Sequence, residues 1–135
     1  MKLAYLLNQY PMPSQTFVRR EIAALEEMGW DVIRVSVRGS TGEVVDPADR
    51  AEVDRTRVVL AGSGGRAGVA LRLVLAVLRT LVRRPDRFAS ALVAAVRLGR
   101  RSDRGMAVNL VYLAEACVVG EWLAEAGVEH VHSHF

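Results

Sequence analysis

The stretch LAYLL (Leu3–Leu7), followed by NQYPMP (Asn8–Pro13) and SQTFVRREIAALEEMG (Ser14–Gly29), decides the fold of this chain. Leu3–Leu7 is a short apolar run, typical of a strand buried on both faces of a parallel sheet. The prolines after it break the strand, because they remove backbone donors and hold their neighbours extended. Ser14 stands at a helix N-cap position and Gly29 at a left-handed C-cap position, so a helix is expected between them.

The next segment completes a β-α-β unit. Apolar side chains share one face of the expected helix: Val18, Ile22, Leu25 and Met28. Two sets of side chains then alternate along Trp30–Arg38: Ile33, Val35 and Val37 on one side, and Arg34, Ser36 and Arg38 on the other. This period of two predicts a second strand.

The following stretch carries weaker signals. Gly39–Thr56 is polar and rich in acids and turn residues, so a loop is expected, and Arg57–Leu60 is a candidate third strand. Ala61–Gly68 is glycine-rich and is expected to be a flexible connector. Its glycines neither follow an expected strand nor precede a Lys-Ser/Thr pair. Both features are needed for a phosphate-binding P-loop, so a P-loop is not expected.

The rest of the chain predicts helices and one more strand. The expected helices are Val69–Arg84, Arg87–Gly99 and about Met106–Ala126, and the expected strand is Val128–Phe135. Strands separated by helices predict an α/β fold with a Rossmann-like open parallel sheet in one domain. Because the last strand has no covering element after it, residues 1–135 are expected to be the front part of a larger domain.

Composition excludes several classes of protein. Hydrophobic residues make up 51% of the 135, so the chain can bury a core, and the single Cys117 excludes an intramolecular disulfide framework and a multi-cysteine zinc site. No secretory signal is recognised. The longest apolar segment, Val69–Val82, contains Arg72 and Arg79, whereas a spanning helix needs about 20 mainly apolar residues. The expected compartment is therefore the cytoplasm.

The net charge of +3 hides an uneven distribution. Residues 66–104 contain ten arginines and two aspartates, whereas residues 105–135 contain four glutamates and no Lys or Arg. Such asymmetry is typical of a face for phosphates or anionic lipid headgroups. The candidates for a membrane-facing surface are Arg83, Arg84, Arg100 and Arg101. The alternative is a solvated arginine face, and nucleic acid is a poorer fit because few aromatic residues lie near the arginines.

Several short motifs resemble one family. The matching stretches are Asn8–Pro11, Ser14–Phe17, Arg19–Glu21, Ala24–Glu26, Tyr112–Cys117 and His130–Phe135. Together they resemble the opening of bacterial family 4 glycosyltransferases, in the exopolysaccharide (colanic-acid-type) subgroup. The resemblance implies the GT-B architecture, in which two Rossmann-like domains face a cleft. The chain would be an incomplete N-terminal, acceptor-side domain, without the C-terminal donor domain.

The resemblance also implies a function. The complete enzyme would be a retaining hexosyltransferase that moves a sugar from a nucleotide-sugar donor to a lipid-linked saccharide acceptor, at the cytoplasmic face of the inner membrane. No cofactor is expected. The family's sugar-facing histidine would follow Phe135 and its paired glutamates belong to the C-terminal domain, so no catalytic residue is assigned and residues 1–135 alone are predicted to be inactive. The alternative is a non-catalytic basic membrane-associated module or a truncated remnant.

The candidate substrate and donor cleft lies after the first strand. Ligands of open α/β sheets bind at the carboxyl ends of the strands, where free helix amides also suit a phosphate. The candidate cleft residues are Asn8, Tyr10, Pro11, Ser14, Gln15, Thr16, Arg20, His132 and His134. An ordinary capped helix is the alternative for this turn. Arg19 and Arg20 are candidates to bind an oxyanion, or to pair with Glu26 or Glu27.

Two further features have structural interpretations. His130, His132 and His134 alternate and so share a strand face, but no fourth ligand is recognised and a metal site is not expected; His130 is expected to be structural. Glu115 lies in an apolar helix, where a buried carboxylate needs a basic partner, with Arg20 as a guess. Cys117 is expected to be a core residue.

Overall fold

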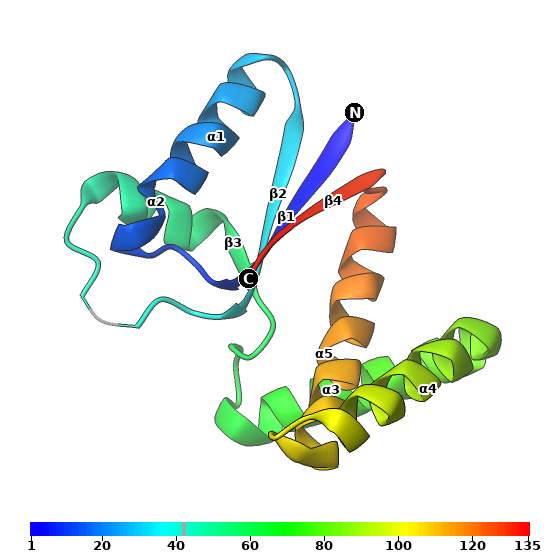
Figure 1. Ribbon diagram of the computed structural model, residues 1–135. Coiled ribbons are helices and arrows are strands. Elements are labelled where there is room, and N and C mark those ends of the chain that lie inside the picture. Colours follow the sequence, from blue (N-terminus) through cyan, green and yellow to red (C-terminus); the bar gives the residue numbers. More distant parts are fainter. Residues whose placement is uncertain (42) are drawn as a thin grey trace. The chain divides into compact units, whose positions relative to one another are not determined.

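The computed structural model describes residues 1–41 and 43–135 and shows an α/β fold with a four-stranded parallel sheet (Figure 1). Its elements, in chain order, are β1 (Lys2–Gln9), the short 3-10 helix η1 (Pro13–Gln15), α1 (Thr16–Glu27), β2 (Asp31–Arg38), α2 (Pro47–Arg55), β3 (Thr56–Val58), α3 (Gly65–Arg83), α4 (Pro85–Arg101), α5 (Gly105–Ala126) and β4 (His130–His134). They form two compact units: the sheet unit, residues 1–62 with 123–135, and the helical unit, residues 63–122.

The sheet confirms the expected Rossmann-like parallel architecture. Its strand order is β3-β2-β1-β4, and every neighbouring pair is parallel. Leu3 lies opposite Val32 on β2 and opposite His130 on β4. The chain steps outward from β1 to β3 and then returns to the other side of β1, so the order of the strands reverses between β1 and β4.

The core of the sheet unit lies between β1 and α1. Leu3, Tyr5 and Leu7 are alternate residues of β1, and all three are buried in one apolar cluster. Val18 and Ile22 of α1 complete that cluster and are fully buried. The apolar run and the helical face recognised in the sequence therefore pack against each other as expected, except at Met28, which was assigned to that face and is 67% exposed.

The two ends of α1 differ from each other in how well they were predicted. Ser14 is not the N-cap, because η1 precedes the helix and Gln15 occupies the cap position without a side-chain hydrogen bond. The amide of Gln15 donates to the Met12 carbonyl oxygen at 2.9 Å, and Thr16 Oγ1 donates to Pro13 O at 2.9 Å. At the other end, Gly29 has φ +88° and donates to Glu26 O, which confirms the left-handed C-cap.

The polar side of β2 is covered rather than exposed. Arg34 is 3% exposed and Ser36 is fully buried, and they share their side of the strand with the core residue Val32. The alternation along β2 is as predicted, and both of its sides carry buried residues. A buried arginine needs compensating charges, and those charges come from helices α1 and α2.

The expected loop Gly39–Thr56 contains a helix, which corrects that prediction; residue 42 lies outside the described residues. Asp46 caps α2 by accepting a hydrogen bond from the Ala48 amide at 2.8 Å, and Pro47 occupies the first turn. An aspartate followed by proline is a helix-start signal. The third strand is Thr56–Val58, slightly earlier than expected, and the amides of the next two residues still donate to β2 carbonyls.

The helical unit contains α3, α4 and most of α5. The prediction that Ala61–Gly68 is a flexible connector is wrong from Gly65 onward, because α3 begins there. Pro85 starts α4, which extends to Arg101, two residues past its expected end. Arg79 of α3 pairs with Glu121 of α5 at 3.7 Å.

Helix α5 corrects the expectation that Val69–Val82 is the longest apolar segment. Among the described residues, α5 has the length and composition of a membrane span, with a mean hydropathy of 1.4 over its most apolar 18 residues. Core helices meet the same two criteria, and Leu113 and Val118 of α5 are buried. Cys117 is buried as expected, and burial raises the pKa of its thiol. Glu115 is also buried, and its pairing with Arg20 stays a prediction.

Candidate functional site

The strand order places two of the sequence motifs at one edge of the sheet. The first motif, Asn8–Pro11, spans the carboxyl end of β1 and the residues after it, and His134 lies at the carboxyl end of β4, two residues after His132. Leu7 is directly opposite His134 in the sheet register. The reversal between β1 and β4 is the topological switch point at which open α/β sheets bind ligands.

A pocket of about 250 Å³ opens beside the loop that follows β1. Pro11 and Thr16, two of the candidate cleft residues, line it together with Pro13. Its other lining residues come from the segment between β2 and α2 and the first turn of α2: Ser40, Thr41, Glu43, Val44, Val45, Asp46 and Asp49. The pocket therefore combines hydroxyl groups, carboxylates and proline rings.

Carboxylates dominate the charge of this pocket. Arg19 Nη1 lies 2.8 Å from Asp49 Oδ1 and 3.2 Å from Asp46 Oδ2, so the alternative pairing of Arg19 with Glu26 or Glu27 is wrong. The Ala48 amide and Arg19 lower the pKa of Asp46, which keeps that carboxylate ionised. A pocket with this charge favours a neutral ligand rich in hydroxyl groups over a phosphate.

Tyr10 is held away from the pocket by α2. Its hydroxyl donates to Glu52 Oε2 at 2.9 Å, and its side chain is 1% exposed. Burial, followed by the hydrogen bond to Glu52, raises the pKa of the Tyr10 phenol. The peptide bond between Tyr10 and Pro11 is cis, and Pro11 is buried as well. These contacts fix the loop that follows β1.

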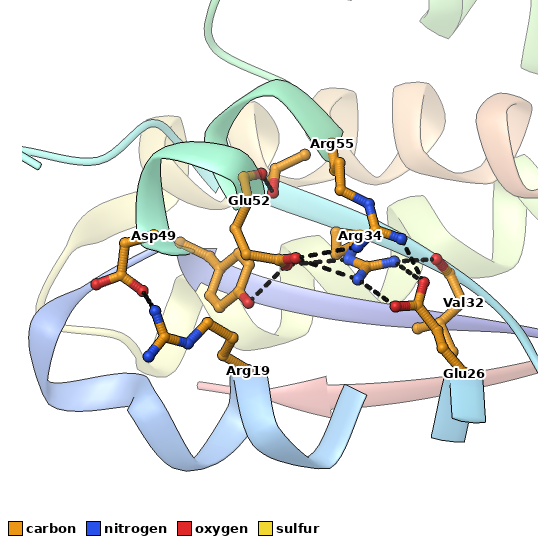
Figure 2. Close-up of polar contacts among 9 residues, drawn as sticks. Arg19, Glu26, Val32, Arg34, Asp49, Glu52 and Arg55 are labelled. Carbon is orange, nitrogen blue, oxygen red and sulfur yellow. Dashed lines mark hydrogen bonds and ion pairs between the residues drawn. The ribbon is translucent and has the colours of Figure 1, made fainter. Parts of the chain in front are cut away.

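Arg34 lies between two glutamates that come from different helices, as Figure 2 shows. Its guanidinium donates to both carboxylate oxygens of Glu26 at 2.6 and 3.0 Å, and to those of Glu52 at 3.0 and 3.2 Å. It also donates to Val32 O at 2.8 Å. Glu52 is the buried residue of α2, so these polar contacts attach that helix to the sheet.

The charges in this network support one another. Arg55 donates to Glu26 at 2.6 Å and lies 3.4 Å from Glu52, so two carboxylates face two guanidinium groups (Figure 2). The hydrogen bond from Arg34 lowers the pKa of Glu26. Burial by itself would lower the pKa of Arg34, but the hydrogen bonds to Glu26 and Glu52 outweigh it and raise that pKa.

The two histidines form a contact on one face of β4, as the alternation predicts. His132 Nε2 and His134 Nε2 are 3.0 Å apart, and both rings lie against Tyr5, with centroid distances of 5.0 and 6.2 Å. Phe17 meets His134 edge-on at 5.9 Å, which places the pair beside the first turn of α1. Burial and a hydrogen bond with Glu21 raise the pKa of Tyr5. His130 is exposed, although a structural role deeper in the strand was expected.

The remaining candidates are spread over the site. Asn8, Ser14 and Arg20 are exposed, so none of them is held in a preformed cleft. Gln15 Oε1 is buried without a hydrogen-bond partner within residues 1–41 and 43–135.

The four candidate membrane-facing arginines belong to the helical unit, where all are exposed: Arg83, Arg84, Arg100 and Arg101. In the part of the chain that the structure describes, no group of three or more His, Cys, Asp or Glu side chains is placed to hold a metal ion.

Sequence reasoning missed the residues that shape the pocket and its support. Asp46 and Asp49 were assigned to a loop, and Glu52 was not singled out. The pair Asp46-Pro47 was a usable helix-start signal. The role of Arg34 had one weak signal, its position between the apolar residues Ile33 and Val35.

Comparisons with known proteins do not assign the chain to a family: no family model, no curated protein and no solved structure matches it.

Proposed function

We propose that this chain is the acceptor-side N-terminal part of a retaining glycosyltransferase with the GT-B architecture, of the family 4 exopolysaccharide type. The observation that carries the proposal is the reversal of strand order between β1 and β4. The motif Asn8–Pro11 and the end of the motif His130–Phe135, on which the resemblance rests, lie at this one edge of the sheet, since Leu7 is opposite His134. Motifs more than a hundred residues apart in sequence thus meet where such a fold binds its ligand.

The polar pocket is the proposed site for part of the acceptor. Saccharide hydroxyls donate hydrogen bonds to carboxylates and exchange them with hydroxyl side chains, and Glu43, Thr16 and Ser40 offer such groups. Pro11 and Pro13 supply apolar surface for the ring carbons. The nucleotide-sugar donor would be held mainly by a second domain, and no catalytic residue is assigned within residues 1–135. The proposed location is the cytoplasm, at the inner membrane surface.

A transfer assay with the native protein that carries this chain tests the proposal. Lipid-linked saccharides are incubated with a panel of labelled nucleotide sugars, and the anomeric configuration of the product is determined. Retained configuration is expected. Glu43→Gln should raise the KM for the acceptor about tenfold, whereas Glu27→Gln, an exposed glutamate of α1 outside the pocket, should leave it unchanged. A folded protein that transfers no sugar from any donor would refute the proposal.

The second candidate is a non-catalytic basic module. It is favoured by the ten arginines and two aspartates of residues 66–104. The same transfer assay separates the two candidates, because a module without activity would give no product under any condition. An equal KM for the Glu43→Gln and Glu27→Gln variants would also count against acceptor binding in the pocket.

A further inference from the structure

Helix α3 exposes a continuous row of aliphatic side chains. Six of its leucines and valines are exposed: Leu71, Val74, Leu75, Leu78, Leu81 and Val82, which we call the α3 stripe. The exposed fraction reaches 60% for Leu71 and 80% for Val82. At about 100° per residue, the six positions fall within an arc of about 120°. Single exposed leucines are ordinary, but a contiguous apolar row marks an interaction surface.

The opposite side of α3 is already used for packing. Ala76 is buried, and Thr80 and Leu73 are partly buried on that side. Helix α4 packs against α3 within the same compact unit. The α3 stripe is therefore the outer face of a helix whose inner face is occupied, which is the arrangement of an amphipathic helix with apolar groups on its outside.

Arginines follow one border of the α3 stripe. At about 100° per residue, Arg72, Arg79 and Arg83 lie together on one flank of it. The sequence of α3 contains no Asp or Glu, and Arg84 follows directly after the helix. Arginine side chains bury their methylene stems along apolar surface and keep their charged ends in water. An apolar row with a basic border is complementary to the acyl chains and anionic headgroups of a lipid surface.

We infer that the α3 stripe docks on an anionic lipid bilayer, with its leucines and valines among the acyl chains and the exposed Arg83 and Arg84 at the phosphates. The charge of the region argues against a second copy as the occupant. Two copies would bring together segments that each carry ten arginines and two aspartates, and like charges repel. The inference concerns the helical unit alone and does not rest on the proposed transferase activity.

Vesicle co-sedimentation tests the inference directly. The purified chain is mixed with phosphatidylcholine vesicles that contain about a third phosphatidylglycerol, and with pure phosphatidylcholine vesicles. Binding to the anionic vesicles is expected, with at least tenfold weaker partition into the neutral ones. Raising the salt concentration should weaken binding, because the arginine contribution is screened. Equal binding to both kinds of vesicle would overturn the inference.

Variants identify the surface. Leu71→Asn with Leu78→Asn should lower the partition coefficient by tenfold or more, and Val74→Asn with Val82→Asn should do the same independently. Val53→Asn is the matched control, because Val53 is 42% exposed but belongs to the sheet unit and does not line the pocket. Arg83→Gln with Arg84→Gln should cost about fivefold for each arginine. Circular dichroism checks that each variant is folded.

Several outcomes would overturn the inference. One is a folded Leu71→Asn, Leu78→Asn variant that binds anionic vesicles as well as the parent. Another is an equal loss in Val53→Asn, which would show that exposed apolar area in general is responsible. The third outcome comes from light scattering, which measures the oligomeric state of the parent chain without vesicles. A concentration-dependent dimer that Leu78→Asn abolishes would assign the α3 stripe to a second copy instead.

Discussion

Replacing Arg34 by methionine removes the guanidinium that joins β2 to both α1 and α2. Arg34 is 3% exposed and Glu52 is 5% exposed, so the change leaves a buried carboxylate without its main partner. Breaking a buried ion pair on one side costs about 3–5 kcal/mol. Arg55 stays 3.4 Å from Glu52 but is half exposed, and such a contact recovers about 0–1 kcal/mol. We therefore expect a loss of about 2–5 kcal/mol in the free energy of unfolding.

Urea denaturation of the sheet unit measures this loss. The fluorescence of Trp30, which packs against the core of that unit, is followed in a Trp122→Phe background. Arg55→Met is the matched control: it removes a guanidinium that contacts the same two carboxylates but is half exposed, so it should cost about 1 kcal/mol or less. The double variant Arg34→Met, Glu52→Met should recover most of the loss, because no unpaired charge is then left buried.

Two results would refute this reasoning. If Arg34→Met and Arg55→Met cost the same, burial does not determine the strength of the contact. If the double variant is as unstable as Arg34→Met alone, the loss comes from packing or from the hydrogen bond of Arg34 to Val32 rather than from an unpaired Glu52.

Three further predictions concern single contacts of the sheet unit, each checked by urea midpoints. Arg34 holds the pKa of Glu26 below its ordinary value of 4.5, so the contribution of Glu26 to stability is complete above that value and is lost as the pH falls below it. The parent should therefore lose stability more steeply than Glu26→Gln as the pH falls below about 4.5. Asp46→Ala should cost about 1 kcal/mol, because Asp46 caps α2, whereas Ser14→Ala should cost less than about 0.5 kcal/mol; equal costs would restore Ser14 as a cap. Gly29→Ala should cost about 1 kcal/mol through the backbone alone, since φ is +88° and an added Cβ meets nothing within 4 Å; an unchanged midpoint would contradict this.

The parts of the fold that the sequence predicts well are those with local signals. β1 is a short apolar run, α1 has an apolar face and a glycine cap, and β4 has a period of two. Each signal depends on neighbouring residues only. Helix α2 lacks an apolar face, and its buried residue is Glu52, so a search for hydrophobic periodicity passes over it.

The candidate site was predictable in position but not in detail. The edge at the end of β1 follows from the parallel sheet, and the contact between His132 and His134 follows from their alternation. The direction of Tyr10 depends on Glu52, which lies 42 residues further along the chain. The partners of Arg19 likewise come from α2. Long-range ion pairs of this kind leave no periodic pattern in the sequence.

The attachment of α2 through ions rather than apolar side chains has a calorimetric consequence. Exposing apolar surface raises the heat capacity and exposing polar surface lowers it. Release of α2, which uncovers the carboxylate of Glu52 and the guanidinium of Arg34, should therefore carry a small or negative heat-capacity change. Unfolding of the β1–α1 core carries a large positive one. Cooling weakens the apolar core but not this attachment, so the segment that borders the pocket stays docked at low temperature.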